Sequence, residues 1–220
     1  MSKIFHSIQN VLWTNGYVCV KSMPKLGRAR LIDVHHKDHV RLSSLELVAD
    51  EIYARGLAGN VAEVGVFQGD FAQQVNRVFP DRKLYLFDTF EGFDERDSQV
   101  DRQKGYSRAD GLFPTSVELV LNKMAHPTQC IIKKGWFPES AAGVEDQFVF
   151  VSLDVDLYQA ISSGLEFFYP RLVRNGFIFV HDFNNTNYRG VKPAVREFCS
   201  RQGIGYFPLT DESGSAVIIK

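Results

Sequence analysis

The chain has few cysteines, and it lacks the long apolar segments of membrane and secreted proteins. Its three cysteines, Cys19, Cys130 and Cys199, are odd in number and far apart, which indicates reduced thiols rather than a disulfide framework. No segment has the roughly 20 apolar residues of a membrane span, and the N-terminus has no secretory signal pattern. We therefore expect a cytoplasmic protein with no membrane partner.

An excess of charge of either sign is also absent. The 25 Lys and Arg residues nearly balance the 26 Asp and Glu residues, so the overall charge gives no reason to expect a nucleic-acid partner. The six histidines do not cluster as in a zinc motif. A chain of 220 residues with 45% hydrophobic content is long enough for one globular domain with a full core.

Strand and helix patterns alternate from residue 42 onward. A helix with Ser43 or Ser44 as its cap is expected first. Strands are then expected at residues 61–66, 83–88, 130–133, 148–153, 176–180, 205–209 and 216–219, with helices at 71–79, from 114, at 136–142, 157–173 and 191–201. This order predicts an α/β fold with a seven-stranded, mostly parallel sheet and helices on both faces. No helix separates the final two strands, so the last strand is expected to be antiparallel.

Two segments do not fit the alternation. Residues 1–41 have no clear pattern, and we expect a helical or irregular extension that acts as a lid or dimer contact, before a domain over residues 42–220. Residues 89–113 are polar and are expected to form a loop. Residues 94–113 of this loop are long for a compact domain, where such loops are often lids or disordered, and we expect them to close over the bound ligands.

The first strand ends on an acid and enters a glycine turn. Glu63 offers a carboxylate to a cationic group, and Gly65 and Gly69 leave bare backbone for close approach. About 20 residues on, the second strand ends at Asp88, which is placed to bind the two hydroxyls of a ribose. The pair predicts an adenosine ligand with a positive charge near the first turn.

Polar residues also follow the later strands, where ligands bind in parallel sheets. They are Gly135 and Trp136 after the third strand, Asp154 and Asp156 after the fourth, and His181 and Asp182 after the fifth. If the chain stays extended, Asp154 and Asp156 point to one side, which suits one metal ligand and one base. Each could instead cap the helix that follows. His181 is either a structural histidine or a catalytic base or ligand.

Four blocks in this order resemble the macrocin O-methyltransferase (TylF-like) family. They are residues 63–69 (EVGVFQG), 84–92 (LYLFDTFEG), 135–140 (GWFPES) and 153–158 (LDVDLY). The resemblance covers about residues 42–200 and implies a single Rossmann-like domain of a class I S-adenosylmethionine-dependent methyltransferase. Characterised members use magnesium to methylate a sugar hydroxyl of an antibiotic.

The resemblance also implies roles for individual residues. The expected cofactor-binding residues are Glu63, Gly65 and Gly69 at the methionine portion, Asp88 and Thr89 at the ribose, Gly135 and Trp136 beside the adenine, and Asp154. Asp154 is also expected to bind the metal. Asp156 is expected to be the general base, with His181 as a second catalytic candidate.

One position departs from the family pattern. The relatives carry two adjacent aspartates after the fifth strand, both on the metal, whereas this chain has His181 and Asp182. A neutral imidazole is a softer ligand than a carboxylate, and magnesium prefers oxygen. We expect Asp154, His181 and Asp182 to hold Mg²⁺ or another divalent cation, with the absence of a metal as the alternative.

The expected partner is a small-molecule hydroxyl acceptor such as a sugar, and residues 1–40 offer a contact for a homo-oligomer. Two other functions stay open. A nicotinamide-dependent oxidoreductase normally has a Gly-x-Gly-x-x-Gly loop, but this turn has only two glycines, and Glu63 would repel a pyrophosphate. A cofactor-binding scaffold without activity would not need the acids at the fourth and fifth strands.

Overall fold

The computed structural model describes residues 11–12, 14, 30–32, 38–108 and 115–220. The chain divides into two units, residues 1–30 and 31–220. The expected N-terminal extension lies largely outside the described residues. Every element named below belongs to the second unit. Helix α2 (His39–Ala54) runs across the domain boundary that we expected between residues 41 and 42.

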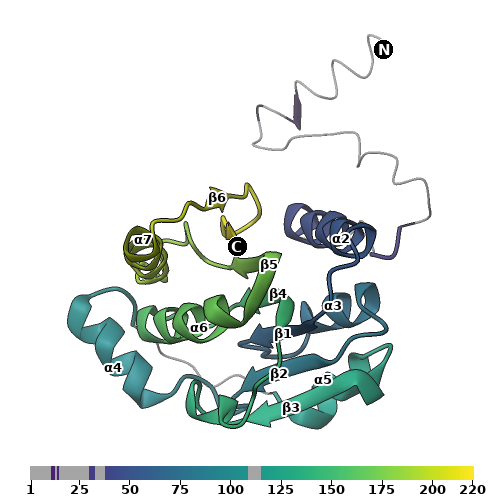
Figure 1. Ribbon diagram of the computed structural model, residues 1–220. Helices are drawn as coiled ribbons and strands as arrows, with labels where there is room; N and C mark the ends of the chain where they lie inside the picture. Colours follow the sequence, from purple (N-terminus) through teal and green to yellow (C-terminus); the bar gives the residue numbers. More distant parts are fainter. Residues whose placement is uncertain (1–10, 13, 15–29, 33–37, 109–114) are drawn as a thin grey trace. The chain divides into compact units, whose positions relative to one another are not determined.

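The second unit alternates strands and helices along the chain (Figure 1). The elements are α2 (His39–Ala54), β1 (Asn60–Val64), α3 (Ala72–Val78), β2 (Leu84–Asp88), α4 (Glu95–Lys104), α5 (Val117–Lys123), η1 (Pro127–Gln129), β3 (Cys130–Lys134), η2 (Glu139–Ala141), β4 (Phe148–Leu153), α6 (Tyr158–Arg171), β5 (Leu172–Val180), α7 (Val191–Gln202), β6 (Phe207–Pro208) and β7 (Ala216–Ile219).

The strands form one seven-stranded sheet in the order β3-β2-β1-β4-β5-β7-β6. Strands β1 to β5 are parallel, whereas β7 is antiparallel to both β5 and β6. The predicted sheet is thereby confirmed. The chain moves outward from β1 in one direction through β2 and β3 and in the other through β4, so a crevice opens beyond the ends of β1 and β4.

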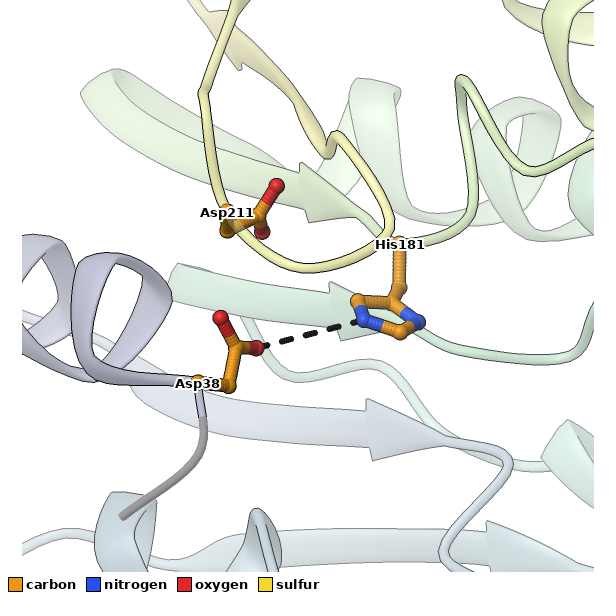
Figure 2. Close-up of side chains that lie close together, drawn as sticks. All are labelled: Asp38, His181 and Asp211. Atoms are coloured by element: carbon orange, nitrogen blue, oxygen red, sulfur yellow. Dashed lines mark ion pairs between the residues drawn. The ribbon is translucent and has the colours of Figure 1, made fainter. Parts of the chain in front are cut away.

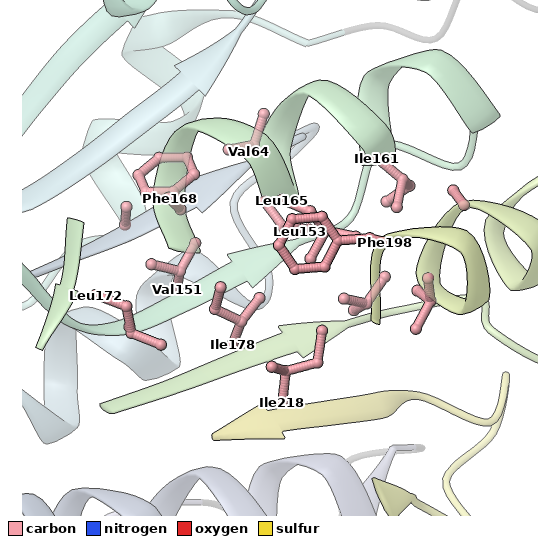
Figure 3. Close-up of a cluster of buried hydrophobic side chains, with 14 of the residues drawn as sticks. Val64, Val151, Leu153, Ile161, Leu165, Phe168, Leu172, Ile178, Phe198 and Ile218 are labelled. Carbon is pink, nitrogen blue, oxygen red and sulfur yellow. The ribbon is translucent and has the colours of Figure 1, made fainter. Parts of the chain in front are cut away.

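Helices cover both faces of the sheet and bury its apolar side chains. Helices α2, α3 and α5 pack on one face, where Leu45, Val75 and Val120 meet β1 and β2. Helices α6 and α7 pack on the other face, where Leu165 and Phe198 contact side chains of the central strands (Figure 3). All six residues of β4 are buried, as expected for a parallel strand covered on both sides.

Several expected boundaries were wrong. Helix α2 begins at His39, so Ser43 lies inside the helix, where it is buried. Strand β5 begins at Leu172, directly after a helix whose last turn contains Pro170. Residues 136–142 contain only the short η2 turn. Pro114 lies outside the described residues, and α5 begins after Ser116, whose side chain accepts a hydrogen bond from the amide of Leu119.

The segment expected to be a loop contains helix α4. Asp94 caps the helix by accepting a hydrogen bond from the amide of Arg96, and Gly105 ends it in the left-handed conformation. Both termini therefore have standard capping chemistry. The residues that α4 buries are Asp97, Ser98 and Asp101, so no apolar periodicity identifies this helix from the sequence.

Within the described ranges, no helix combines the length and the apolar content that a membrane crossing requires.

Candidate active site

A cavity of about 500 Å³ lies beyond the carboxyl ends of β1, β2, β4 and β5. All of the predicted site residues line it except Gly69 and Asp182. The topology of the sheet therefore brings together side chains that are more than 100 residues apart in the sequence. Their contacts define a glycine turn, a cluster of charged groups and an aromatic end.

The glycine turn after β1 is packed directly against the chain that leaves β4. Gly65 has φ of 82°, and a Cβ added there would lie 2.0 Å from the carbonyl oxygen of Asp154. The position thus has no room for a side chain. Gly69 also has a positive φ, but it faces away from the cavity, where its Cβ would lie 3.1 Å from Val120 of α5.

The Asp88 carboxylate holds this turn in place. Its Oδ2 accepts hydrogen bonds from the amides of Val66 at 2.7 Å and Phe67 at 2.8 Å, and its Oδ1 accepts one from the amide of Phe90. The neighbouring Thr89 hydroxyl donates to the carbonyl of Gly92 at 2.6 Å. These bonds fix the backbone around the place where a ribose is expected.

Glu63 is a buried acid beside the turn. Its side chain is 1% exposed, and its Oε2 has no hydrogen-bond partner among the residues that the structure describes. Burial, together with the nearby Asp154 carboxylate, raises the pKa of Glu63 well above its ordinary value. A cationic group in the cavity would offset that penalty and supply the missing partner.

Asp154 lies between two cationic groups. Its Oδ2 accepts a hydrogen bond from Arg41 of α2 at 2.9 Å, and its Oδ1 is 2.9 Å from Nδ1 of His181. Arg41 also donates to the Ser152 hydroxyl and lies over the Phe71 ring. Burial raises the pKa of Asp154, but Arg41 and His181 outweigh it, and the pKa falls below its ordinary value.

Asp182 lies behind this cluster and orients it. Its Oδ2 is 2.8 Å from Nδ1 of His181, and its Oδ1 accepts a hydrogen bond from the Asn185 amide group at 2.6 Å. Burial lowers the pKa of His181, but the Asp154 and Asp182 carboxylates outweigh it and raise the pKa to about 10. The imidazole is therefore protonated at neutral pH in this arrangement.

The chain does not stay extended through Asp156, as the sequence analysis assumed, because φ there is 61°. The carboxyl group still lines the cavity. Burial and a hydrogen bond to Asp182 raise the pKa of Asp156 well above its ordinary value. The raised pKa favours the protonated carboxyl group, so Asp156 must lose this proton before it can act as a base, and the ionised group is then a stronger proton acceptor.

The other edge of the His181 ring faces two further acids (Figure 2). Nε2 of His181 is 4.0 Å from Oδ2 of Asp38, which precedes α2. Asp211, in the turn between β6 and β7, offers a third ligand atom within 4.8 Å of the other two. Asp154, His181 and Asp182 form a second such group, so His181 belongs to both.

The opposite end of the cavity is aromatic. Gly135 has φ of 131° and leads into Trp136, whose indole Nε1 donates a hydrogen bond to Oδ2 of Asp97 at 2.8 Å. The guanidinium of Arg96 lies 3.7 Å from the centre of the Trp136 ring. Helix α4 is thus fixed to the loop that follows β3.

The sequence profile of the family described as Macrocin-O-methyltransferase (TylF) matches residues 35–218. This match spans the sheet except its last residue, Ile219, and it includes every residue that lines the cavity. The chain belongs to this family. It is therefore an S-adenosylmethionine-dependent O-methyltransferase, and the nicotinamide-dependent alternative is wrong.

Two curated relatives support the family membership. The chain is 28% identical over 190 residues to 8-demethyl-8-(2,3-dimethoxy-alpha-L-rhamnosyl)-tetracenomycin-C 4'-O-methyltransferase of Streptomyces olivaceus, covering 80% of this chain and 71% of that protein. It is 27% identical over 180 residues to Mycinamicin III 3''-O-methyltransferase of Micromonospora griseorubida, covering 74% of this chain and 69% of that protein.

Solved structures share the fold. The O-methyltransferase NovP superposes with a TM-score of 0.69 at 20% identity, covering 83% of this chain and 80% of that one. The calicheamicin methyltransferase CalS11 gives a TM-score of 0.66 at 19% identity, with 81% and 78% covered. The methyltransferase fold of this chain is therefore shown independently of the sequence blocks.

Three residues of this O-methyltransferase site were missed by the sequence analysis. Arg41 and Asp38 belong to a segment without a clear pattern, and Asp97 lay in the expected loop. Only their contacts in the folded chain identify them. The alternative that Asp154 or Asp156 caps α6 is wrong. The first amide of α6, that of Tyr158, donates its hydrogen bond to Asp101 instead.

Proposed function

We propose that this O-methyltransferase transfers the methyl group of S-adenosylmethionine to a hydroxyl group of a sugar on a small-molecule glycoside. The observation that carries the proposal is the convergence of Glu63, Asp88 and Asp154 on one cavity. Both relatives are named as O-methyltransferases that act on a numbered oxygen, and the name of the first includes a rhamnosyl group. A sugar hydroxyl is therefore the acceptor we propose for this chain.

The cofactor would extend along the cavity from Glu63 to Trp136. The partnerless carboxyl oxygen of Glu63 suits the ammonium group of the methionine portion, and Gly65 lets the backbone approach it. Each Asp88 oxygen that accepts amide hydrogen bonds keeps acceptor capacity for a ribose hydroxyl. Gly135 and Trp136 would then border the adenine.

The acceptor hydroxyl would lie between the sulfonium and the acids after β4 and β5. Once ionised, Asp156 would take the hydroxyl proton while the acceptor oxygen forms a bond to the methyl carbon and the carbon–sulfur bond of the methyl donor breaks. The products are the methyl ether, the neutral thioether S-adenosylhomocysteine and a protonated Asp156. Alignment of the donor and the acceptor gives the largest reduction of the barrier, and removal of the hydroxyl proton lowers the barrier further. His181 is the second candidate for proton transfer, since it contacts Asp154 and Asp182.

The donor set after β4 and β5 fits a divalent cation. The Nδ1 of His181 is 2.9 Å from an Asp154 oxygen and 2.8 Å from an Asp182 oxygen. Neighbouring ligands of an octahedral ion with bonds near 2.1 Å lie about 3.0 Å apart. Asp154, His181 and Asp182 would hold the ion after His181 loses its Nδ1 proton. A bound cation would lower the pKa of the acceptor hydroxyl.

A turnover assay with an acceptor panel tests the function. The purified protein is incubated with S-adenosylmethionine carrying a deuterated methyl group, with and without Mg²⁺ or Mn²⁺, and with glycosides of deoxysugars, their free aglycones and catechols. We expect the mass shift of one labelled methyl group on a glycoside only. Transfer to the aglycones or catechols alone would contradict the sugar acceptor. Binding of S-adenosylhomocysteine without any transfer would favour the inactive scaffold.

A further inference from the structure

Asp38 occupies the N-cap position of α2 but does not cap the helix. An aspartate at this position normally accepts a hydrogen bond from an amide of the first helical turn, and the side chain of Asp38 makes no such bond. It lines the cavity instead, where the side chain is 13% exposed and its Oδ2 is 4.0 Å from Nε2 of His181 (Figure 2). The carboxylate is thus directed to the imidazole rather than to the helix.

The two nitrogens of the His181 ring face different groups. Nδ1 contacts the carboxylates of Asp154 and Asp182, which are the other two ligands of the proposed cation site. Nε2 faces Asp38. A neutral imidazole has a single N–H, so a ring that binds a cation through Nδ1 keeps its proton on Nε2. This N–H then needs an acceptor, and the carboxylate beside it is that of Asp38.

Asp211 lies in the same group of side chains but has other partners. Its Oδ1 accepts a hydrogen bond from the Ser215 amide at 2.5 Å, and its Oδ2 accepts one from the Ser215 hydroxyl. Asp211 thus holds the turn between β6 and β7. The Oδ1 of Asp38 accepts a hydrogen bond from the amide of Glu212 in the same turn, at 3.5 Å, which keeps Oδ2 on the side of the ring. The acceptor for Nε2 is therefore Asp38 rather than Asp211.

We propose that Asp38 is a positioning residue, which accepts a hydrogen bond from Nε2–H of His181 and thereby orients the ring so that Nδ1 binds the cation. This assignment rests on the cation site of the proposed function. At 4.0 Å the two atoms are too far apart for a direct bond, so a rotation of the Asp38 side chain or one bridging water completes the contact. Histidines that bind metals usually make such a bond through the other ring nitrogen. A carboxylate at position 181 has no N–H to orient, so Asp38 has this role because the chain carries a histidine there.

A double-mutant cycle on cation binding tests the assignment independently of turnover. Mn²⁺ is titrated into the wild type, Asp38→Ala, Asp38→Asn, His181→Asp and the double variant Asp38→Ala/His181→Asp, and electron paramagnetic resonance follows the free ion. We expect Asp38→Ala to weaken Mn²⁺ binding by about tenfold or more, as for other groups that orient a metal ligand. Asp38→Asn should lose less, because its amide oxygen still accepts a hydrogen bond. In the His181→Asp background, Asp38→Ala should have no comparable effect, because no ring remains to be oriented.

A charge control separates orientation of the ring from simple attraction of the cation. Asp211→Asn removes a carboxylate charge from the same group of side chains and keeps an oxygen for the Ser215 amide, so it should change the Mn²⁺ affinity much less than Asp38→Ala does. Equal losses from Asp38→Ala in both backgrounds, or equal losses in Asp38→Ala and Asp211→Asn, would overturn the assignment. An unchanged affinity in Asp38→Ala would do the same and leave the cation site standing. Asp38→Ser takes the place of Asp38→Ala if the alanine variant does not fold. Absence of Mn²⁺ binding in the wild type would instead overturn the proposed cation site, and with it this assignment.

Discussion

The Asp101 carboxylate in α4 accepts a hydrogen bond from the amide of Tyr158, the first residue of α6, at 2.9 Å. Leu157 occupies the N-cap position of α6 and makes no side-chain cap, so an acid from another helix satisfies this amide. The first turn of α6 directly follows Asp154 and Asp156. Helix α4, which the sequence did not reveal, therefore stabilises the segment that carries these two acids.

Replacing Asp101 by Ala should destabilise the protein by ~1–2 kcal/mol, the usual effect of losing a helix cap. Asp101→Asn keeps an acceptor oxygen and should lose less. Urea unfolding gives the free energy of unfolding of each variant. Equal midpoints for Asp101→Ala and the wild type would show that the amide of Tyr158 finds another partner.

Gly65→Ala should be far more damaging than the same change at another glycine with a similar φ. The added Cβ at Gly65 would meet the Asp154 carbonyl oxygen at 2.0 Å, whereas a Cβ at Gly105, where φ is 66°, would have no atom of the described residues within 4 Å. We expect a loss of ~2–4 kcal/mol at Gly65, from backbone strain and overpacking, and of ~1 kcal/mol at Gly105. Thermal unfolding of the two variants measures the difference. Similar losses would mean that the turn can move away from β4.

Asp97 should make the wild type less stable as the pH rises. Burial raises its pKa to about 6, with a further rise from Asp94 and Asp101 that the Trp136 indole and Arg96 oppose. Because the folded pKa lies above the unfolded value, the folded state binds more protons between about pH 4 and 6. The stabilisation is complete below pH 4 and is lost as the pH rises through 6.

The size of this effect is up to ~3 kcal/mol for a shift of about two units in a buried group. It should be absent in Asp97→Asn. Urea unfolding at pH 4, 5, 6 and 7 gives the difference in unfolding free energy between the wild type and the variant. A difference that stays constant over this range would contradict the raised pKa.

Asp154→Asn and Asp88→Ala should have opposite effects on binding and turnover. Asp154→Asn should abolish turnover and leave the affinity for S-adenosylhomocysteine nearly intact, because we propose that Asp154 lies on the acceptor side. Asp88→Ala should weaken that affinity by roughly 1–3 kcal/mol through lost hydrogen bonds to a charged group. Calorimetry and the labelled-methyl assay give the two quantities. A comparable loss of affinity in both variants would show that the roles are assigned wrongly.

His181 should favour Mn²⁺ over Mg²⁺, because an imidazole nitrogen suits transition metals better than magnesium. Titration with Mn²⁺, followed by electron paramagnetic resonance of the free ion, should show binding that His181→Ala weakens by about tenfold or more. His181→Asp should improve Mg²⁺ binding. The control is Asp70→Asn. Asp70 is another acid of the cavity, and it is bound to Lys123, so its replacement should change the affinity for neither Mn²⁺ nor Mg²⁺. Absence of Mn²⁺ binding in the wild type would remove the proposed metal site.

The sequence predicted the fold and the strand-end acids because both depend on local patterns. Apolar runs identify buried strands such as β4, and the chain order of strands and helices then determines which ends meet. Helix α4 has no such signal, since Val100 is its only aliphatic residue and its buried side chains are polar. Its stability comes from end caps and from contacts with Trp136 and Tyr158, which lie far away in sequence.

The cations of the site were equally hidden. Arg41 and Asp154 are 113 positions apart in the sequence, and no sequence pattern around either residue predicts their contact. His181 was recognised as a departure from the family pattern, but its two carboxylate contacts appear only when β4 and β5 lie side by side.

The position of β7 between β5 and β6 has a consequence for self-association. It makes β6 an edge strand that is only two residues long, and one of these residues, Pro208, has no amide hydrogen to donate. The edge strand on the opposite side, β3, ends with Lys133 and Lys134. Short strands, prolines and lysines at the edges of a sheet disfavour pairing with a strand of a second chain. Strand exchange and fibril formation are thus disfavoured at both edges of the sheet.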